Sequence, residues 1–283
     1  MKVRIGTRGS RLALAQTQRV IKKLKAVAPK LKPEVMVIRT SGDAGLRKKP
    51  GAFVNEINMA LLEGKIDIGV HSLKDLPTKL PGGVVLACVP ERLRPNDALV
   101  SRENTDIWKL PSGAVIGTDS PRRVAELSSL RPDLKFKEIR GNVDTRIRKI
   151  EDGIYDATVV ALAALERLGL NRAAQIFKLD EVVPAVGQGA LAITARVDMI
   201  YPFLKKINDQ KAWIETTCER VFLESLGGGC KSGAGAVARV MNGKIQLICV
   251  VHRGGRRLLK LTGSDPVELG RKAGVMLCQA RST

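Results

Sequence analysis

The chain has 283 residues, and this length predicts two or three domains rather than one. Hydrophobic residues make up 44% and charged residues 27% of it, which predicts a globular protein with a buried core. No stretch approaches the roughly 18 uninterrupted apolar residues of a transmembrane helix, so a membrane-spanning protein is not expected. The formal net charge of +20 predicts attraction to anions.

Hydrophobic periodicity predicts alternating strands and helices in the first third of the chain. Ser10 is a suitable N-cap, Pro29 ends the helix that follows it, and Gly64 stops the next helix. The expected elements are a strand over 3–5, the helix between Ser10 and Pro29, a strand over 35–38, a polar loop over 40–50, a helix over 53–63 and a strand over 66–70. The order of strands and helices predicts an α/β domain.

A charged segment with two prolines, residues 90–97, predicts a crossover to a second domain in which the same pattern restarts. There we expect strands over 114–117, 135–139 and 157–161, and helices over 122–130 and 145–152. A glycine-rich turn over 186–189 and a strand over 190–195 follow. These residues therefore predict a second α/β unit.

The remaining residues predict a small α+β domain. Three glycines, 227–229, break a helix that is expected over 212–226. Strand-like runs over 236–240, 245–251 and 258–261 precede a helix from Val267. We predict the domains as 1–92 with 188–207, 96–184, and 208–283.

The distribution of basic residues and of cysteines restricts partners and compartment. No aspartate or glutamate occurs from Met1 to Pro33 or from Ser225 to Ser264, so nucleic acid, acidic membranes and small polyanions are all candidate partners, beside a merely solvated surface. The five cysteines form no C-x-x-C pair, and neither a zinc site nor a disulfide framework is expected. The N-terminus has no apolar run of signal-peptide length, and we predict a cytoplasmic protein.

Three predicted strand-to-helix turns carry arginines: residues 6–10, 117–123 and 140–146. A helix N-terminus offers free N–H groups and a positive dipole end to a carboxylate or phosphate, and the guanidinium suits planar carboxylates. One such turn often has a geometric role only, but three of them predict a small ligand with several carboxylates. Only 3% of the residues are aromatic, whereas nucleic-acid-binding surfaces more often interleave aromatic and basic residues.

Two further segments could carry chemistry. The expected strand over 66–70 delivers residues 71–75, His-Ser-Leu-Lys-Asp, at its carboxyl end, where α/β folds place ligands. Asp75 could stay ionised there beside a cationic intermediate, or it could be a turn residue before Pro77. Cys230 follows three glycines that give it room to project into a cleft, although a buried structural cysteine is the ordinary interpretation.

Seven segments in order resemble the porphobilinogen deaminase family, from Val3 to at least Cys230. They are Gly6-Thr-Arg8 with Ser10 and Leu12-Ala-Leu14, Val70-His-Ser-Leu-Lys-Asp75, Gly117-Thr with Arg122-Arg123, Arg140-Gly-Asn-Val-Asp-Thr-Arg146, Arg167-Leu-Gly169, Pro184-Ala-Val-Gly-Gln-Gly-Ala190 and Gly228-Gly-Cys230. The resemblance implies an α/β fold with two domains like type II periplasmic binding proteins, an active site in the cleft between them, and a small C-terminal α+β domain.

The resemblance also implies a transferase of tetrapyrrole and heme biosynthesis. Four porphobilinogen molecules lose ammonia and join into linear hydroxymethylbilane on a dipyrromethane cofactor, which is attached by a thioether to the residue that matches Cys230. Asp75 matches the catalytic aspartate, which stabilises a cationic methylene-pyrrolenine and manages the protons.

The family's binding residues carry over to matching positions. The positions that match cofactor-binding residues are Cys230, Lys74, Asp75, Ser120, Arg122, Arg123 and Arg146. The positions that match substrate-binding residues are Arg8, Ser10, Gln16, Arg140, Arg146 and Arg167. The basic side chains would bind the acetate and propionate of each pyrrole, and no metal is expected. The implied partner is a small polycarboxylate pyrrole rather than nucleic acid or a membrane, and a monomer is expected.

The chain departs from the family pattern at three places. The loop over 43–53, an active-site lid in the family, is shorter than usual and has Pro50 where a lysine is common. Asp119 replaces a serine and should repel substrate carboxylates unless Arg122 or Arg123 pairs with it. After Cys230 a proline is missing, so we expect a differently shaped cysteine loop.

Two alternatives come from other classes of protein. A non-catalytic, two-lobed small-anion-binding protein would give Asp75 and Cys230 no role. A basic nucleic-acid-binding protein would bind polyanions of any sequence in a salt-sensitive way, and the net charge alone supports it.

Overall fold

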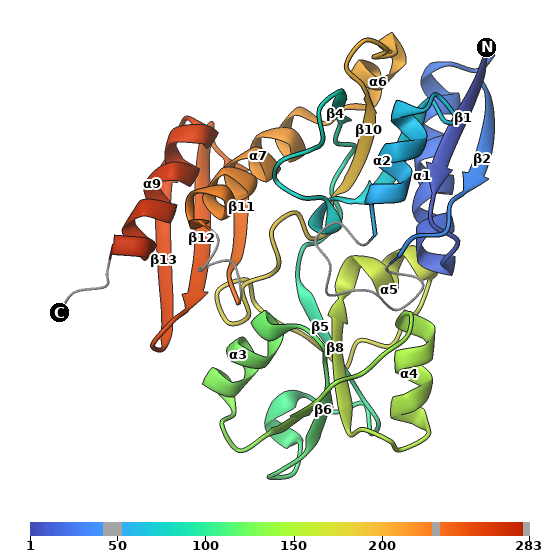
Figure 1. Cartoon of the computed structure of the whole chain (residues 1–283). Coiled ribbons are helices and arrows are strands. Elements are labelled where there is room, and N and C mark those ends of the chain that lie inside the picture. Colours follow the sequence, from blue (N-terminus) through green and yellow to red (C-terminus); the bar gives the residue numbers. More distant parts are fainter. Residues whose placement is uncertain (42–52, 228–232, 280–283) are drawn as a thin grey trace. The chain divides into compact units, whose positions relative to one another are not determined.

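A computed structural model describes residues 1–41, 53–227 and 233–279 of the chain (Figure 1). Its residue contacts divide the chain into two compact units, 1–93 with 190–213 and 94–189 with 214–283. The division into three domains remains a prediction. No helix in the described part of the chain is long and apolar enough to cross a membrane.

The first unit is built on a five-stranded sheet in the order β2-β1-β3-β10-β4. The strands are β1 (Lys2–Thr7), β2 (Lys32–Val37), β3 (Ile68–Ser72), β4 (Val84–Cys88) and β10 (Leu191–Arg196). The helices are α1 (Arg11–Val27), α2 (Asn55–Leu62) and α6 (Pro202–Ile207). β1 is parallel to β2 and β3, whereas β10 is antiparallel to β3 and β4. Pairing of β10 with these two strands explains why the segment 190–213 belongs to this unit.

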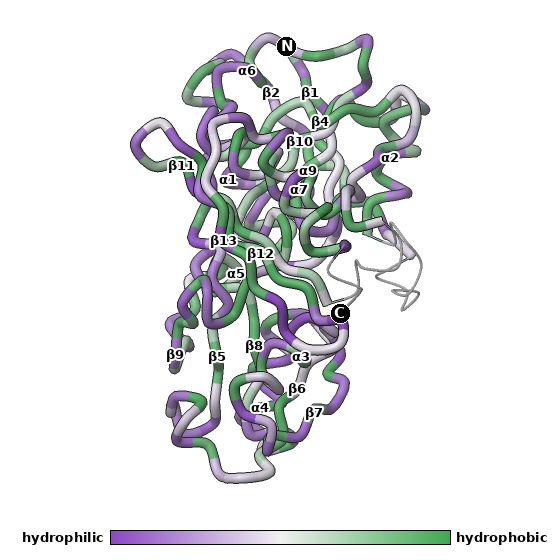
Figure 2. The backbone as a smooth tube through the Cα atoms, turned by 90° about the vertical axis from the view of Figure 1, so that its left-hand side faces the viewer, coloured by the Kyte–Doolittle hydropathy of each residue, from purple (hydrophilic) through white to green (hydrophobic). Residues whose placement is uncertain are grey.

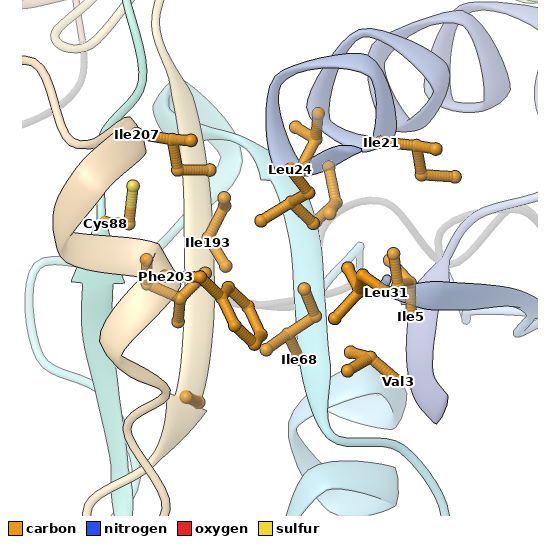
Figure 3. Close-up of a cluster of buried hydrophobic side chains, with 14 of the residues drawn as sticks. Val3, Ile5, Ile21, Leu24, Leu31, Ile68, Cys88, Ile193, Phe203 and Ile207 are labelled. Carbon is orange, nitrogen blue, oxygen red and sulfur yellow. The ribbon is translucent and has the colours of Figure 1, made fainter. Parts of the chain in front are cut away.

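The largest core of the first unit lies between the sheet and helices α1 and α6 (Figure 3). On α1, the buried apolar residues Val20, Ile21 and Leu24 recur at helical spacing on one face. They pack with Val3, Ile5, Leu31, Ile68, Cys88, Ile193, Phe203 and Ile207. This packing fixes α1 against β1 and β3, whose carboxyl ends carry the candidate residues of this unit.

The second unit contains a sheet in the order β7-β6-β8-β5-β9, which repeats the arrangement of the first. The strands are β5 (Asp97–Ser101), β6 (Val115–Gly117), β7 (Lys135–Lys137), β8 (Ala157–Ala161) and β9 (Gln175–Ile176), and the helices are α3 (Pro121–Leu130), α4 (Val143–Glu151) and α5 (Leu162–Leu168). β6 is parallel to β7 and β8, and β5 is antiparallel to β8 and β9. The central strand β8 is mostly apolar and buried at every residue (Figure 2).

Within the described residues, the C-terminal part of the chain contains an antiparallel sheet and the helices α7 and α9. The strands are β11 (Gly235–Met241), β12 (Lys244–His252) and β13 (Arg256–Gly263), and the helices are α7 (Gln210–Ser225) and α9 (Pro266–Gln279). Two glycines of α9 allow it to approach α7 closely, because a Cβ at Gly270 would collide with the carbonyl oxygen of Cys218 and one at Gly274 with the side chain of Ser225.

The α/β class of the two larger sheets and the α+β class of the C-terminal part are confirmed. The sequence-predicted strands and helices all occur, with ends shifted by a few residues. Besides two short 3-10 turns, Leu73–Asp75 and Ile107–Lys109, the described elements that sequence reasoning missed are β4, β5, β9, α5 and α6. β4, β5 and β9 are completed by pairing with partners far along the chain, which local periodicity does not reveal.

Glu126 of α3 joins the antiparallel sheet to the rest of the second unit. Its carboxylate is fully buried. Oε1 lies 3.0 Å from Nε2 of His252 on β12, and Oε2 accepts hydrogen bonds of 3.2 Å from Nε and Nη2 of Arg256 on β13. Nη2 of Arg256 also donates to the carbonyl oxygen of Asp180 over 2.7 Å.

We expect Glu126→Gln to lower the free energy of unfolding by roughly 1.5–3 kcal/mol, because the charged acceptor of Arg256 is lost in a buried place. Urea denaturation would measure the change. Asp180→Asn is the matched control, because Asp180 pairs with Lys260 on the same sheet at 2.8 Å but both side chains are about half exposed. Equal effects of the two substitutions would contradict the assigned role of Glu126.

Candidate active site

Hydrogen bonds tie the end of β1 to the end of β3 through α1. The Oγ of Ser10 caps α1 by accepting a bond of 3.2 Å from the N–H of Ala13. Gln16 is only 4% exposed, and its Nε2 donates to Oγ of Ser72 over 2.8 Å. Two predicted binding residues therefore help to build the site: Ser10 orients the helix, and Gln16 joins it to β3.

A pocket in the first unit collects candidate residues from the ends of β1 and β3. It is lined by Arg8, Ala13, Gln16, Phe53, Val54, Val70, His71, Ser72 and Asp75. The guanidinium carbon of Arg8 lies 4.1 Å from the centre of the Phe53 ring, a cation–π contact that orients this cation. The sequence signalled Arg8, Gln16 and Asp75, but it carried no signal for Phe53.

Asp75 ends the short 3-10 turn η1 (Leu73–Asp75) that follows β3. Leu73 is buried and anchors the turn, whereas Asp75 is half-buried at the pocket. Among the described residues, no hydrogen bond or ion pair engages the Asp75 carboxylate. That carboxylate is therefore available to a cationic ligand. Lys74, the preceding residue, is exposed and is not among the residues that line this pocket.

A buried carboxylate in the second unit holds two of the predicted arginines. Asp97 is fully buried, with Oδ2 at 2.7 Å from Nη2 of Arg122 and Oδ1 at 2.7 Å from Nη2 of Arg123. Gln188 donates to the same Oδ1 over 2.9 Å. Burial by itself would raise the pKa of Asp97, but the two guanidinium charges and these hydrogen bonds hold that pKa far below its usual range.

The arginine pair keeps binding capacity after pairing with Asp97. Two guanidinium charges against one carboxylate leave a net charge of +1. Nε and Nη2 of Arg123 are bonded to Asp97, while its Nη1 has no partner within the described residues. Ser120 is the N-cap of α3 and accepts a bond of 3.4 Å from the N–H of Arg123. This helix start can therefore still bind an anion.

We expect Asp97→Asn to destabilise the protein by roughly 3–5 kcal/mol, because it leaves two buried guanidinium groups without a countercharge. The wild-type contribution is present above the ordinary aspartate pKa of about 4 and is lost as pH falls toward the lowered folded-state pKa. Urea denaturation between pH 7 and pH 3 measures this contribution to the free energy of unfolding. The Asp97→Asn variant should lack the decrease in stability that comes from protonation of Asp97.

Asp133→Asn is the control for this prediction. Asp133 is bonded to Arg131 at the same 2.7 Å, but its side chain is 34% exposed. We expect a smaller loss of stability there, because solvent reaches the Asp133 carboxylate and screens its interaction with Arg131. A loss at Asp133 as large as that at Asp97 would contradict the role given to burial.

The other predicted arginines lie at separate positions of the second unit. Nη2 of Arg146 is 3.0 Å from Oδ1 of Asp119. Asp119 therefore has Arg146 as its ion-pair partner, whereas Arg122 and Arg123 are bonded to Asp97 instead. Nε of Arg140 lies 3.1 Å from Glu138 in an exposed position.

Arg167 belongs to the last turn of α5, and its Nη2 donates to the carbonyl oxygen of Gly189 over 2.6 Å. Cys230, Pro50 and the lid loop lie outside the described residues, apart from Phe53. The predictions made for that cysteine and that loop therefore stay predictions.

Comparison with known proteins places these residues in a family context. A family model described as porphobilinogen deaminase, dipyromethane cofactor binding domain, matches residues 3–200, and the C-terminal domain model of the same family matches residues 213–279. The "Probable porphobilinogen deaminase" of Pyrobaculum neutrophilum is 42% identical, with 99% of both chains covered. The porphobilinogen deaminase of Roseiflexus sp. is 44% identical over 94% of this chain and 92% of its own. Among solved structures, the methionine binding protein MetQ covers 77% of this chain and 91% of its own at a TM-score of 0.48 and 15% identity.

Proposed function

This chain belongs to the porphobilinogen deaminase family, and we propose that Asp75, the arginines described above and Cys230 carry out its reaction. The enzyme is a transferase that condenses four porphobilinogen molecules into linear hydroxymethylbilane and releases ammonia. One observation carries the assignment of the catalytic residue: the Asp75 carboxylate lines a pocket with Arg8 and has no partner among the described residues.

Asp75 would stabilise the positive charge of the reacting pyrrole and accept a proton from it. Loss of ammonia from porphobilinogen leaves a cationic pyrrole, and a carboxylate whose charge no guanidinium neutralises stabilises that cation as it develops. Formation of each new carbon–carbon bond then requires a proton to leave carbon, and Asp75 can accept it. Arg8 is held over Phe53 and can bind a carboxylate of the same substrate.

The residues of this chain fit a dipyrromethane, whose two pyrroles carry acetate and propionate groups. The Asp97 cluster keeps a positive charge, and Arg123 keeps an unengaged Nη1 at the start of α3. The residues proposed to hold the cofactor are Cys230, through a thioether, with Lys74, Asp75, Ser120, Arg122, Arg123 and Arg146. When bound, this cofactor supplies the tethered nucleophilic carbon that primes chain growth.

The substrate carboxylates are assigned to the remaining basic and polar residues. We propose that substrate is bound by Arg8, Ser10, Gln16, Arg140, Arg146 and Arg167. In the described structure Ser10 and Gln16 already make bonds that shape the pocket, so their contribution would be partly to hold Arg8 and Ser72 in place.

Incubation of the purified protein with porphobilinogen tests the proposed function. We expect one ammonia released for each porphobilinogen consumed, together with a linear tetrapyrrole, both followed over time. Binding of porphobilinogen without ammonia release would instead support the non-catalytic anion-binding protein. Salt-sensitive binding of unrelated nucleic acids, without turnover, would support the nucleic-acid-binding alternative.

We also propose a cytoplasmic monomer that acts on this small substrate and binds neither nucleic acid nor a membrane. Cys88, Cys218 and Cys249 are buried and form no disulfide within the described structure, which supports a reducing compartment. Sedimentation at several concentrations measures the oligomeric state, and a concentration-dependent dimer would contradict the monomer.

A further inference from the structure

His71 lies in the pocket beside Asp75, and the proposed reaction does not use it. It is the last but one residue of β3, its side chain is 5% exposed, and it is one of the residues that line the pocket. Burial lowers the pKa of His71 to about 4, so the ring is neutral at physiological pH. A neutral imidazole carries one N–H and one bare nitrogen, and the partners of the ring decide which nitrogen has the proton.

The partner of His71 is Thr194 on the neighbouring strand β10. Nε2 of His71 lies 2.9 Å from Oγ1 of Thr194, and Thr194 is fully buried. The two side chains meet over Gly69, which pairs with Thr194 across the strands. A Cβ at Gly69 would lie 2.6 Å from Oγ1 of Thr194 and 2.8 Å from Nε2 of His71, so the absence of a side chain makes room for this pair.

The hydrogen-bonding capacity of Thr194 determines the tautomer. Its hydroxyl has one proton to donate, and within the described residues Nε2 of His71 is its only side-chain bonding partner. If Nε2 carried the proton, the buried hydroxyl would accept a bond but its own donor would be left unsatisfied, which is costly. Thr194 therefore donates to Nε2, and the imidazole proton is on Nδ1. Nδ1 has no partner among the described residues.

We propose that His71 is a substrate-binding residue whose Nδ1–H donates a hydrogen bond to a carboxylate of the pyrrole bound in this pocket. The chemistry of the ligand selects the acceptor. The pyrrole N–H and the protonated aminomethyl group of porphobilinogen are donors, so its carboxylates are the groups that accept. The identity of the ligand depends on the proposed function, whereas the assignment of the tautomer depends only on the contact between His71 and Thr194.

Nitrogen-15 NMR of the uniformly labelled full chain, without substrate, tests the tautomer. The chain has only two histidines, His71 and His252, and a His71→Asn variant assigns the two rings. In the wild-type chain, we expect two-bond proton–nitrogen couplings that place the His71 proton on Nδ1. The Thr194→Ser variant should show the same coupling pattern, because serine keeps the hydroxyl donor. Thr194→Val should weaken the preference because it removes the donor. A His71 proton on Nε2 in the wild type would overturn the inference, whatever the enzyme does.

Two variants of His71 test the ligand. The side-chain amide nitrogen of asparagine can occupy the place of Nδ1, whereas that of glutamine reaches the place of Nε2. We expect His71→Gln to raise KM about tenfold with kcat little changed, because one hydrogen bond to a charged acceptor is lost. His71→Asn should retain more of the affinity. Porphobilinogen should also shift the Nδ1 resonance of wild-type His71. A lower kcat at unchanged KM would show that His71 acts on Asp75 instead, and would overturn the assigned acceptor.

Discussion

Replacing Asp75 with asparagine should lower kcat about 10²- to 10⁴-fold and leave the fold intact. The variant keeps the size of the side chain but cannot neutralise a cationic pyrrole or accept its proton. Stability should be nearly unchanged, because the carboxylate makes no hydrogen bond or ion pair with the described residues. Steady-state ammonia release measures the effect, and thermal unfolding checks the fold.

Asp198→Asn provides the matched control for Asp75. Asp198 is another carboxylate of the first unit, its side chain is 75% exposed, and its contact with Arg196 is a long 3.5 Å. We expect wild-type turnover from this variant. If Asp75→Asn retained more than about a tenth of the wild-type kcat, a different group would have to act as the catalytic acid–base.

Cys230→Ser should yield a folded protein without the attached pyrroles and without turnover. None of the other four thiols is expected to replace Cys230 as the attachment site. Burial raises the pKa of Cys88, Cys218 and Cys249 to about 12, so these side chains hold no reactive thiolate near neutral pH. The thiol of Cys278 lies in the last helix, with Sγ 3.4 Å from the carbonyl oxygen of Leu226.

Intact mass with peptide mapping measures the result for Cys230. The wild-type chain should carry the mass of two linked pyrroles on the peptide that contains Cys230, and the serine variant should have the unmodified mass. Cys278→Ser is the control and should keep the modification. Pyrroles on a peptide with any other cysteine, or pyrroles still attached in Cys230→Ser, would show that the attachment site is wrong. An unmodified wild-type chain should gain the mass after incubation with porphobilinogen.

Several features of the site followed directly from local sequence. The helix that begins after Ser10 and the strand that ends before Asp75 are set by hydrophobic periodicity, N-capping and turn residues, which act over a few positions. Because parallel strands in an α/β sheet present their carboxyl ends at one edge, the same local signals placed Arg8 and Asp75 near one another.

Tertiary structure decided which charges are paired and which remain available. Arg122 and Arg123 looked equivalent to Arg146 in the sequence, yet the first two are held by buried Asp97 and the third by Asp119. Asp97 starts β5, and its place depends on the pairing of β5 with β8, some sixty residues further along the chain. No local pattern encodes such a contact.

His71 also shows which features followed from local sequence and which from tertiary structure. The sequence by itself placed an imidazole at the end of a buried strand next to Asp75, and it determined the fold class and the basic character of the turns. The proton position on that imidazole depends on Thr194, which reaches it only because β10 inserts between β3 and β4. Strand order is a property of the whole sheet, since it is set by which apolar faces can be buried together, and so the tertiary structure alone decided it.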